Sequence, residues 1–469
     1  MDSAVSNAVA TDRVMDVLSR HVLTKGMMPL ILDMERSRGA QLIDQATGKE
    51  YLDFFGFYAS SVLGMNHPAL VENDDFMRRL QLVAVNKITN SDIATVHSAR
   101  FVETFARVAI PDYLPYAFFI SGGSLAVENA LKTAFDWKVR KNFQNGHRKE
   151  LGGQVLHFDQ AFHGRSGYTL SLTNTADPRK TQYFPKFDWP RVLNPKVSFP
   201  LDEERIKAVI ETEKMALSQA KMHFQQRKDD IAAVIIEPIQ GEGGDNHFRP
   251  EFLRALKDLA LENDALLIFD EVQTGVGITG RFWAHQRMNV EPDIIAYGKK
   301  TQVCGVLAGR RLDEVDGHVF QVPSRINSTW GGNLVDMVRF DRILEVIEEN
   351  DLVSRAEVMG EYLQKRLQEL AQARASVTSV RGRGLMRAFD VPDGRFRDAV
   401  LERCFANGLI ILGCGRQSIR FRSPLTITED EIDRGVDMID TAVESVERDH
   451  RPVQRSPLHE TLEHPLREE

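Results

Sequence analysis

The sequence is poor in cysteine and contains no long apolar run. Its three cysteines, Cys304, Cys404 and Cys414, are too few for a disulfide framework and lack the pair spacing of a zinc site. Such sparse usage is typical of a reducing compartment, so we expect a cytoplasmic protein. No apolar stretch approaches the roughly 20 residues that span a bilayer, and the first residues lack the apolar centre of a secretory signal. We therefore expect no membrane partner.

The chain also lacks an excess of positive charge. Lysine and arginine total 59 against 67 aspartates and glutamates, which gives a net charge of −8. This balance argues against a nucleic-acid partner, because such proteins bind through a basic surface. No HExxH motif is present, and we expect no metal site.

What the 469 residues do contain is an alternation of apolar strands and amphipathic helices. Buried strands between helices predict a mostly parallel α/β sheet that is covered on both faces. Ligands of such sheets bind beyond the carboxyl ends of the strands. The expected strands are Gln154–His157, Ile231–Glu237, Ala265–Phe269 and Ile294–Tyr297, and helices are expected over Ser124–Lys141 and Pro250–Asn263.

The two chain ends are predicted to form a small lobe beside a large central domain. The N-terminal segment, 1–70, holds a strand pair at Gln41–Ile43 and Tyr51–Phe55. The large domain spans 71–333, a helical connection spans 334–380, and a C-terminal small domain spans 381–446. Residues 447–469 are dense in charge and lack an apolar period, so we predict a disordered tail.

Charged side chains lie at or just beyond the ends of three of the four predicted strands: Glu237, Asp270–Glu271 and Lys299–Lys300. Asp270 ends the run LLIFD, where it either caps the sheet edge or pairs with a cationic ligand. Lys299 and Lys300 follow DIIAYG, where a lysine is either a solvated charge or a buried amine able to form a Schiff base. Because side chains alternate along an extended chain, only one of the two lysines is expected to point inward.

A Gly-Gly pair lies between an apolar strand and a helix in FFISGGSLAVENALK. Glycines at this place let backbone N–H groups approach an anion at the positive end of the helix. The alternative is an ordinary turn with Ser121 or Ser124 as the N-cap. The segment lacks the GxxxxGK[ST] and GxGxxG patterns, so it does not indicate a common nucleotide site.

Two further segments carry aromatic and cationic side chains. AFHGRSGYTLSLT places Phe162 where it either packs in the core or faces a planar ligand, and Arg165 where it either lies in solvent or binds a carboxylate. IRFRSPL places Arg420 and Arg422 on one face of a strand, where one is expected to bind an anion and the other to stay solvated.

These features together match the needs of one cofactor. Pyridoxal 5'-phosphate requires a phosphate cradle, a carboxylate beside its pyridine nitrogen, and a lysine for covalent attachment. The Gly-Gly turn, the aromatic Phe162, the strand-end Asp270 and a lysine shortly after it supply all of these.

At this point the sequence resembles the class III aminotransferases of fold type I. SGGSLAVENALK, AFHGRSGYTLSLT, EPIQGEGGD, LLIFDEVQTGVGITG, PDIIAYGKK and NSTWGGN carry the resemblance, which covers about residues 13–446. It implies a large domain with a mostly parallel seven-stranded sheet, a small α/β domain from both chain ends, and a homodimer.

The resemblance also implies which residues hold the cofactor. Lys299 matches the lysine that binds it covalently, with Lys300 as the weaker candidate, and Asp270 matches the partner of the pyridine nitrogen. Gln273 should lie near the phenolic oxygen and Phe162 on the ring. The phosphate should be bound by Gly123, by Ser124 and by Thr329 of the other subunit.

On the substrate side, SLTNTADPRKTQYFPKFDWPR, GKKTQVCGV and PSRINSTWGGN resemble members that transfer the ε-amino group of L-lysine to 2-oxoglutarate, giving L-glutamate. Arg420 matches the arginine for the α-carboxylate of the acceptor, and Glu242 matches a switch that neutralises it while lysine is bound. Arg165 should bind the distal carboxylate. Asn327 either assists at the lysine site or bonds within its own turn.

The sequence also fits other amino donors and other functions. Tyr58 resembles a tyrosine used by ornithine aminotransferases, although it also reads as a packed core aromatic. Ornithine, 4-aminobutyrate or another ω-amine is therefore the first rival donor, since one methylene is worth only about 1–3 kcal/mol of discrimination. A non-catalytic binding or regulatory relative is the second rival, and a mutase or decarboxylase is the third.

Overall fold

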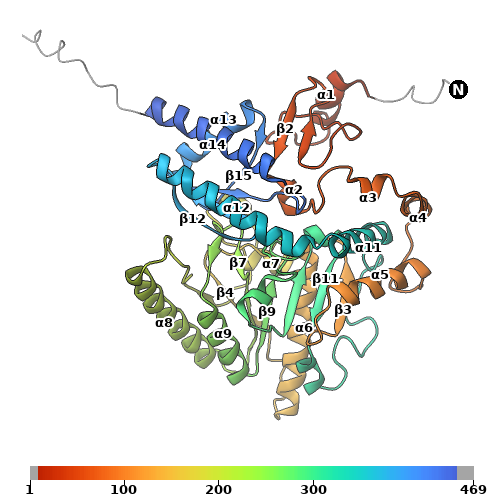
Figure 1. The fold of residues 1–469 in the computed structure, drawn as a ribbon. Helices are drawn as coiled ribbons and strands as arrows, with labels where there is room; N and C mark the ends of the chain where they lie inside the picture. Colours follow the sequence, from red (N-terminus) through yellow and green to blue (C-terminus); the bar gives the residue numbers. More distant parts are fainter. Residues whose placement is uncertain (1–8, 451–469) are drawn as a thin grey trace, which may run out of the picture.

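The computed structural model describes residues 9–450, and its centre is a seven-stranded sheet that confirms the expected α/β fold (Figure 1). The strand order is β3-β11-β10-β9-β6-β4-β5, and β11 alone runs antiparallel to its neighbours β10 and β3. The strands are β3 (Tyr116–Ile120), β4 (Gln154–Phe158), β5 (Arg191–Val192), β6 (Ile231–Ile236), β9 (Leu266–Asp270), β10 (Ile294–Tyr297) and β11 (Cys304–Ala308).

The four strands predicted from apolar runs are β4, β6, β9 and β10, and they lie side by side in the middle of the sheet. Their residues alternate between two cores. Val234 and Ile236 of β6 share a core with Leu256, whereas Ile235 shares the other with Ala130. This period of two explains why every residue of β6 is buried.

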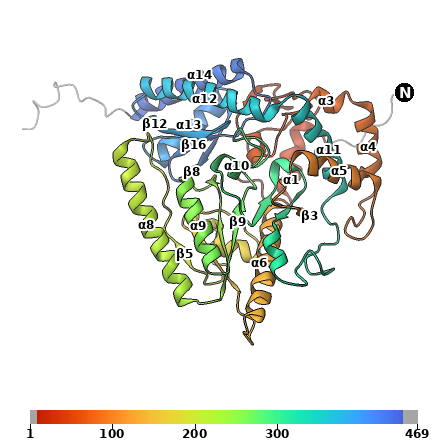
Figure 2. The ribbon, with the colours of Figure 1, turned by 60° about the horizontal axis from the view of Figure 1, so that its bottom comes forward.

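Helices cover both faces of this sheet and connect its strands. Figure 2 shows α6 and α9 with the sheet between them. These helical elements are α4 (Asp74–Ala84), α5 (Val96–Val108), α6 (Gly123–Gln144), α7 (Gly167–Leu172), η2 (Pro178–Lys180), α8 (Glu203–Gln226), α9 (Pro250–Glu262), α10 (Ala284–Met288), η3 (Lys299–Thr301) and η4 (Arg310–Glu314).

A smaller lobe combines both ends of the described chain. The strand β14 (Leu409–Ile410) pairs with β2 (Glu50–Asp53), which pairs in turn with β1 (Gln41–Ile43). A second sheet has the order β12-β13-β16-β15, and β7 (Ile239–Gln240) pairs with β8 (Asn246–His247). The strands of the second sheet are β12 (Thr378–Arg383), β13 (Met386–Asp390), β15 (Leu412–Cys414) and β16 (Ser418–Phe421).

The helices of this lobe lie above the central sheet in Figure 1. The long helical region expected after Leu334 is two helices, because Asp351 takes a left-handed conformation with φ 44°. The last helix runs to His450, and so enters the range predicted as a tail; residues 451–469 lie outside the described residues. The remaining elements are η1 (Thr11–Arg13), α1 (Val14–Ser19), α2 (Gly56–Ala59), α3 (Pro68–Val71), α11 (Leu334–Glu349), α12 (Leu352–Ala373), α13 (Gly394–Ala406) and α14 (Glu429–His450).

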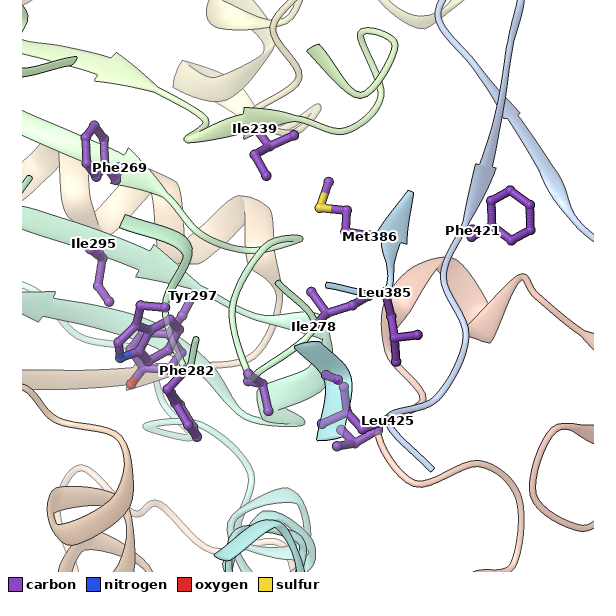
Figure 3. Close-up of a cluster of buried hydrophobic side chains, with 14 of the residues drawn as sticks. Ile239, Phe269, Ile278, Phe282, Ile295, Tyr297, Leu385, Met386, Phe421 and Leu425 are labelled. Carbon is purple, nitrogen blue, oxygen red and sulfur yellow. The ribbon is translucent and has the colours of Figure 1, made fainter. Parts of the chain in front are cut away.

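One apolar core joins the two lobes. Phe269 and Tyr297 of the central sheet belong to the same buried cluster as Leu385, Met386 and Phe421 of the small lobe (Figure 3). A continuous core therefore holds the central sheet and the small lobe together. Within the described residues, no helix combines the length and apolarity that crossing a bilayer requires.

Candidate active site

A cavity of about 290 Å³ lies where β9 and β10 end and α6 begins. This is the edge of the sheet at which the parallel topology predicts a ligand site. Seven residues predicted for the site line the cavity, and four that we did not predict join them. The predicted ones are Gly123, Ser124, Phe162, Arg165, Asp270, Gln273 and Lys299; the others are His163, Gly164, Glu237 and Val272.

The start of α6 is open toward the cavity. Its N-cap is Gly122, with φ 108°, and no side chain caps the helix, so the alternative of a serine N-cap is wrong. The Oγ of Ser124 lies instead 2.8 Å from the Oγ1 of Thr169. A Cβ on Gly123 would approach Val272 Cγ1 to 2.9 Å. The first-turn N–H groups of a long helix are thereby left for an anion.

A buried histidine holds the strand-end aspartate. Asp270 is 5% exposed, and its Oδ2 lies 2.8 Å from Nδ1 of His163. Its Oδ1 accepts a hydrogen bond from the backbone N–H of Val272 at 3.0 Å. The Nε2 of His163 is buried without a partner among the described residues. His163 was not predicted as a site residue, and its place next to Phe162 in the segment AFHGRSGYTLSLT is the sequence signal that could have found it.

Glu237 positions the loop that carries Phe162. Its two oxygens accept backbone N–H groups, from Phe162 at 2.9 Å and from Gly241 at 3.1 Å. Burial raises the pKa of Glu237 to about 7, with Asp270 acting in the same direction and His163 opposing it. A single carboxylate directly after β6 therefore ties the Phe162 loop, which lines the cavity, to the turn at Gly241.

Lys299 and Lys300 are both directed into the protein, so the expectation that only one points inward is wrong. The chain leaves β10 as a turn rather than an extended strand, and Lys299 has φ 56°. Lys300 is 2% exposed and donates to the carbonyl oxygens of Ala59 at 3.1 Å and Gln273 at 2.9 Å. Lys300 is thus a structural tether, whereas Lys299 lines the cavity.

The surroundings of Lys299 favour its neutral amine over its protonated form. Burial and then the positive charges of Arg420 and Arg422 lower its pKa to about 8, although Asp270 and Glu237 oppose the shift. A neutral amine is the form that attacks carbonyl carbon and accepts protons. Lys299 therefore has the environment of a nucleophile and base.

Arg420 is buried and only partly paired. Its Nη2 donates to Oε2 of Glu242 at 2.8 Å, while its Nε and Nη1 have no partner among the described residues. Lys180 binds the other oxygen of Glu242. Burial opposes ionisation of Glu242, but the two cations outweigh it and lower the pKa of the carboxyl group. The pairing of Arg420 with Glu242 agrees with the geometry that a carboxylate switch needs.

The expectation that one arginine of the segment IRFRSPL is solvated is wrong, because Arg422, like Arg420, is buried. It is 1% exposed and ion-paired with Asp245. It also donates to Oε1 of Gln273, from Nε at 2.8 Å and from Nη2 at 2.6 Å. Arg422 is retained in the interior because its buried charge is fully paired. Its role is to fix the Gln273 amide at the cavity wall.

Five predicted site residues are not among those that line the cavity: Arg420 and Glu242, which form the ion pair described above, and Tyr58, Asn327 and Thr329. Tyr58 is 55% exposed and packs edge-on against Phe55, so the alternative of a core aromatic is wrong. Asn327 is exposed and accepts the backbone N–H of Ser328, as expected for a residue that bonds within its turn. Thr329 is exposed on the same loop.

The residues present fit pyridoxal 5'-phosphate. The start of α6, which no described side chain caps, offers backbone N–H donors to a phosphate, and Nδ1 of His163 holds Asp270, the carboxylate that a pyridine nitrogen requires. Phe162 provides an apolar ring at the wall, and Lys299 provides a buried amine.

Comparison with known proteins agrees with this chemistry. Residues 22–443 match the family described as aminotransferase class-III. The L-lysine-epsilon aminotransferase of Mycobacterium tuberculosis is 55% identical over 433 residues, which cover 92% of this chain and 95% of the relative. The enzyme of the same name from Streptomyces clavuligerus is 50% identical over 447 residues, covering 95% and 96%. A solved lysine aminotransferase from M. tuberculosis in the internal aldimine form is 54% identical, with TM-score 0.91 over 93% of this chain and 100% of that one.

Proposed function

The chain belongs to the class III aminotransferases, and from that premise we propose that it transfers the ε-amino group of L-lysine to 2-oxoglutarate. The products would be L-glutamate and L-2-aminoadipate 6-semialdehyde, which cyclises to a piperideine carboxylate. The donor is supported by the similarity to two L-lysine-epsilon aminotransferases. The acceptor is supported by the cationic groups Arg420 and Arg165.

The observation that carries the proposal is the incomplete pairing of buried Arg420. Its two unpartnered nitrogen atoms suit a carboxylate, and Glu242 occupies the remaining one. When the donor presents an amine, Glu242 neutralises the arginine, since an unpaired buried charge is destabilising. When a 2-oxo acid arrives, its α-carboxylate takes the place of Glu242. Arg165, exposed at the cavity and without an ion pair among the described residues, binds the distal carboxylate.

Pyridoxal 5'-phosphate is the cofactor, and when bound it acts as an electron sink for the carbon that loses a proton. In our proposal Gly123 and Ser124 donate backbone N–H groups to its phosphate. Phe162 covers its ring, and Gln273 lies beside its phenolic oxygen. Asp270, held by His163, keeps a proton on the ring nitrogen.

Lys299 binds the cofactor and then moves the proton. Its lowered pKa leaves a substantial neutral fraction near neutral pH, so the released amine can remove a proton from the ε-carbon of lysine. The same ammonium group can afterwards return that proton. Lys300 takes no part, because both of its carbonyl partners are structural.

Class III aminotransferases are typically dimers, and we propose that Thr329 reaches the phosphate of the partner subunit. The loop of Thr329 is fixed to its own chain, since the Trp330 carbonyl accepts the Asn90 N–H at 3.2 Å. Beside that loop, the side chains of Ile93 and Val96 are 59% and 80% exposed. A groove lined by these apolar side chains supports burial against a second copy.

A single-turnover titration tests the proposed function. The holoenzyme is mixed with L-lysine, L-ornithine, 4-aminobutyrate or L-alanine without an acceptor, and loss of the cofactor's visible absorbance is followed. We expect rapid loss with L-lysine alone, and recovery on addition of 2-oxoglutarate. Faster loss with ornithine or 4-aminobutyrate would move the donor to that amine, and no loss with any amine would contradict an aminotransferase.

A further inference from the structure

Glu242 is shared between two cations that come from distant parts of the chain. Arg420 on β16 holds Oε2, and Lys180 at the end of η2 holds Oε1. The side chains of Glu242 and Lys180 are each 23% exposed, whereas that of Arg420 is only 4% exposed. The Lys180 ammonium group also lies 5.9 Å from the ring centroid of Phe162, at the wall of the cavity. Lys180 is therefore part of the substrate-facing charge network.

We propose that Lys180 is a positioning residue that retains Glu242 when a dicarboxylate acceptor displaces it from Arg420. The inference rests on the proposed function, in which Glu242 and the acceptor's carboxylate alternate on that arginine. Lys180 thereby stabilises the arrangement in which the acceptor is bound and raises the affinity of the site for dicarboxylates.

The two arrangements of Glu242 leave different charges without a partner when Lys180 is lost. With Glu242 on Arg420, the loss of Lys180 removes one of two partners, and the carboxylate stays neutralised. With Glu242 released, the loss of Lys180 removes the partner that remains, and a mostly buried carboxylate is left without a cation. The released arrangement is therefore destabilised more, and a ligand that requires it must bind more weakly.

The surroundings of Lys180 support this assignment. Among the described residues, Glu242 is the sole ion-pair partner of Lys180. Its neighbour Arg179 pairs with Asp177 and is 83% exposed, so the two adjacent cations have separate roles. The turn that carries them is pinned by Asp177, which caps it through the backbone N–H of Arg179. A fixed turn thus holds Lys180 beside Glu242. In our proposal that carboxylate is either bound to Arg420 or released from it.

The test compares Lys180→Met, Lys180→Arg and the matched control Arg179→Met as holoenzymes. Binding of glutarate, a dicarboxylate that cannot accept an amine, is measured by calorimetry, and both half-reactions are followed by stopped-flow absorbance. We expect Lys180→Met to weaken glutarate binding about fivefold, the range of a partly exposed ion pair, and to slow the lysine half-reaction by a smaller factor. Lys180→Arg should restore binding, and Arg179→Met should match the wild type.

A double-mutant cycle separates positioning from loop stability. In a Glu242→Gln background, Lys180→Met should leave the glutarate affinity of that background unchanged, since no carboxylate remains to be held. Equal losses in both half-reactions, an equal effect of Arg179→Met, or no rescue by arginine would overturn the assignment of Lys180. A wild-type enzyme without turnover on lysine and 2-oxoglutarate would instead overturn the proposed function, and the inference with it.

Discussion

Replacing Glu242 with alanine should separate the two half-reactions. The side chain of Arg420 is 4% exposed, and the substitution removes the partner of its Nη2. Its Nε and Nη1 already lack one among residues 9–450, so none of the three nitrogen atoms would keep a described protein partner. The lysine half-reaction must then proceed beside an unneutralised buried cation. The acceptor half-reaction should be spared, because the incoming carboxylate neutralises the same arginine.

The size of the effect follows from the burial of the pair. Removing one partner of a fully buried ion pair costs about 3–5 kcal/mol. The Glu242 side chain is 23% exposed, so water can reach the position that it vacates. We therefore expect a smaller cost of about 2 kcal/mol for its removal. That free energy corresponds to about a 30-fold slower lysine half-reaction. Glu242→Gln keeps the hydrogen bond without the charge and should give a smaller loss.

Stopped-flow absorbance of the holoenzyme measures each half-reaction without the other substrate. We expect the lysine step to slow about 30-fold and the dissociation constant for 2-oxoglutarate to fall, since no carboxylate competes for Arg420. Glu213→Ala is the matched control, because it removes one of the two carboxylates paired with Arg249, and neither Glu213 nor Arg249 lines the cavity. Equal losses in the two half-reactions of Glu242→Ala would refute the switch.

Three further predictions follow from the site. In cofactor-free protein, the rate of recombination with pyridoxal 5'-phosphate should rise with pH through a midpoint of about 8, because burial and nearby arginines lower the pKa of Lys299 and only its neutral amine reacts; a midpoint at the ordinary lysine pKa of about 10.4 would count against this environment. Lys300→Met should lower the free energy of unfolding by about 1–3 kcal/mol, since it removes the donor to two carbonyl groups, and an unchanged Tm would show that the tether is dispensable. Co-expressed Lys299→Ala and Thr329→Ala chains should form mixed dimers with one intact site and regain activity; a mixture no more active than its homodimers would place Thr329 in its own chain's site.

The sequence predicts the centre of the fold because buried parallel strands carry their signal locally. Runs such as Ile231–Ile236 are apolar throughout, and β4, β6, β9 and β10 appear where such runs are found. The outer strands were harder to foresee. β5 has only two residues, and β11 runs antiparallel, so neither leaves a pattern distinct from that of a loop or a turn.

A site residue can be predicted when its motif lies at the end of a predicted strand or helix. It cannot be predicted when its place in the site depends on a contact with a residue far away in the sequence. Gly123, Asp270 and Lys299 sit at the ends of predicted elements, and all three line the cavity. The contact between His163 and Asp270, by contrast, joins residues 107 positions apart. The contact between Lys180 and Glu242 spans 62 positions. Single-sequence patterns carry no information on which side chains such separations bring together.

Arg420 and Arg422 illustrate why residue type and spacing do not settle a role. Both are buried, and they lie two positions apart, so sequence alone treats them alike. Arg422 is paired with Asp245 and the Gln273 amide, and displacing Asp245 would leave a buried charge without a counterion. Among the residues that the structure describes, Arg420 has one side-chain partner, Glu242, and its Nε and Nη1 have none. We therefore assign the exchange of carboxylates to Arg420 in the proposed function, in which Lys180 keeps its contact with Glu242 when that carboxylate leaves the arginine.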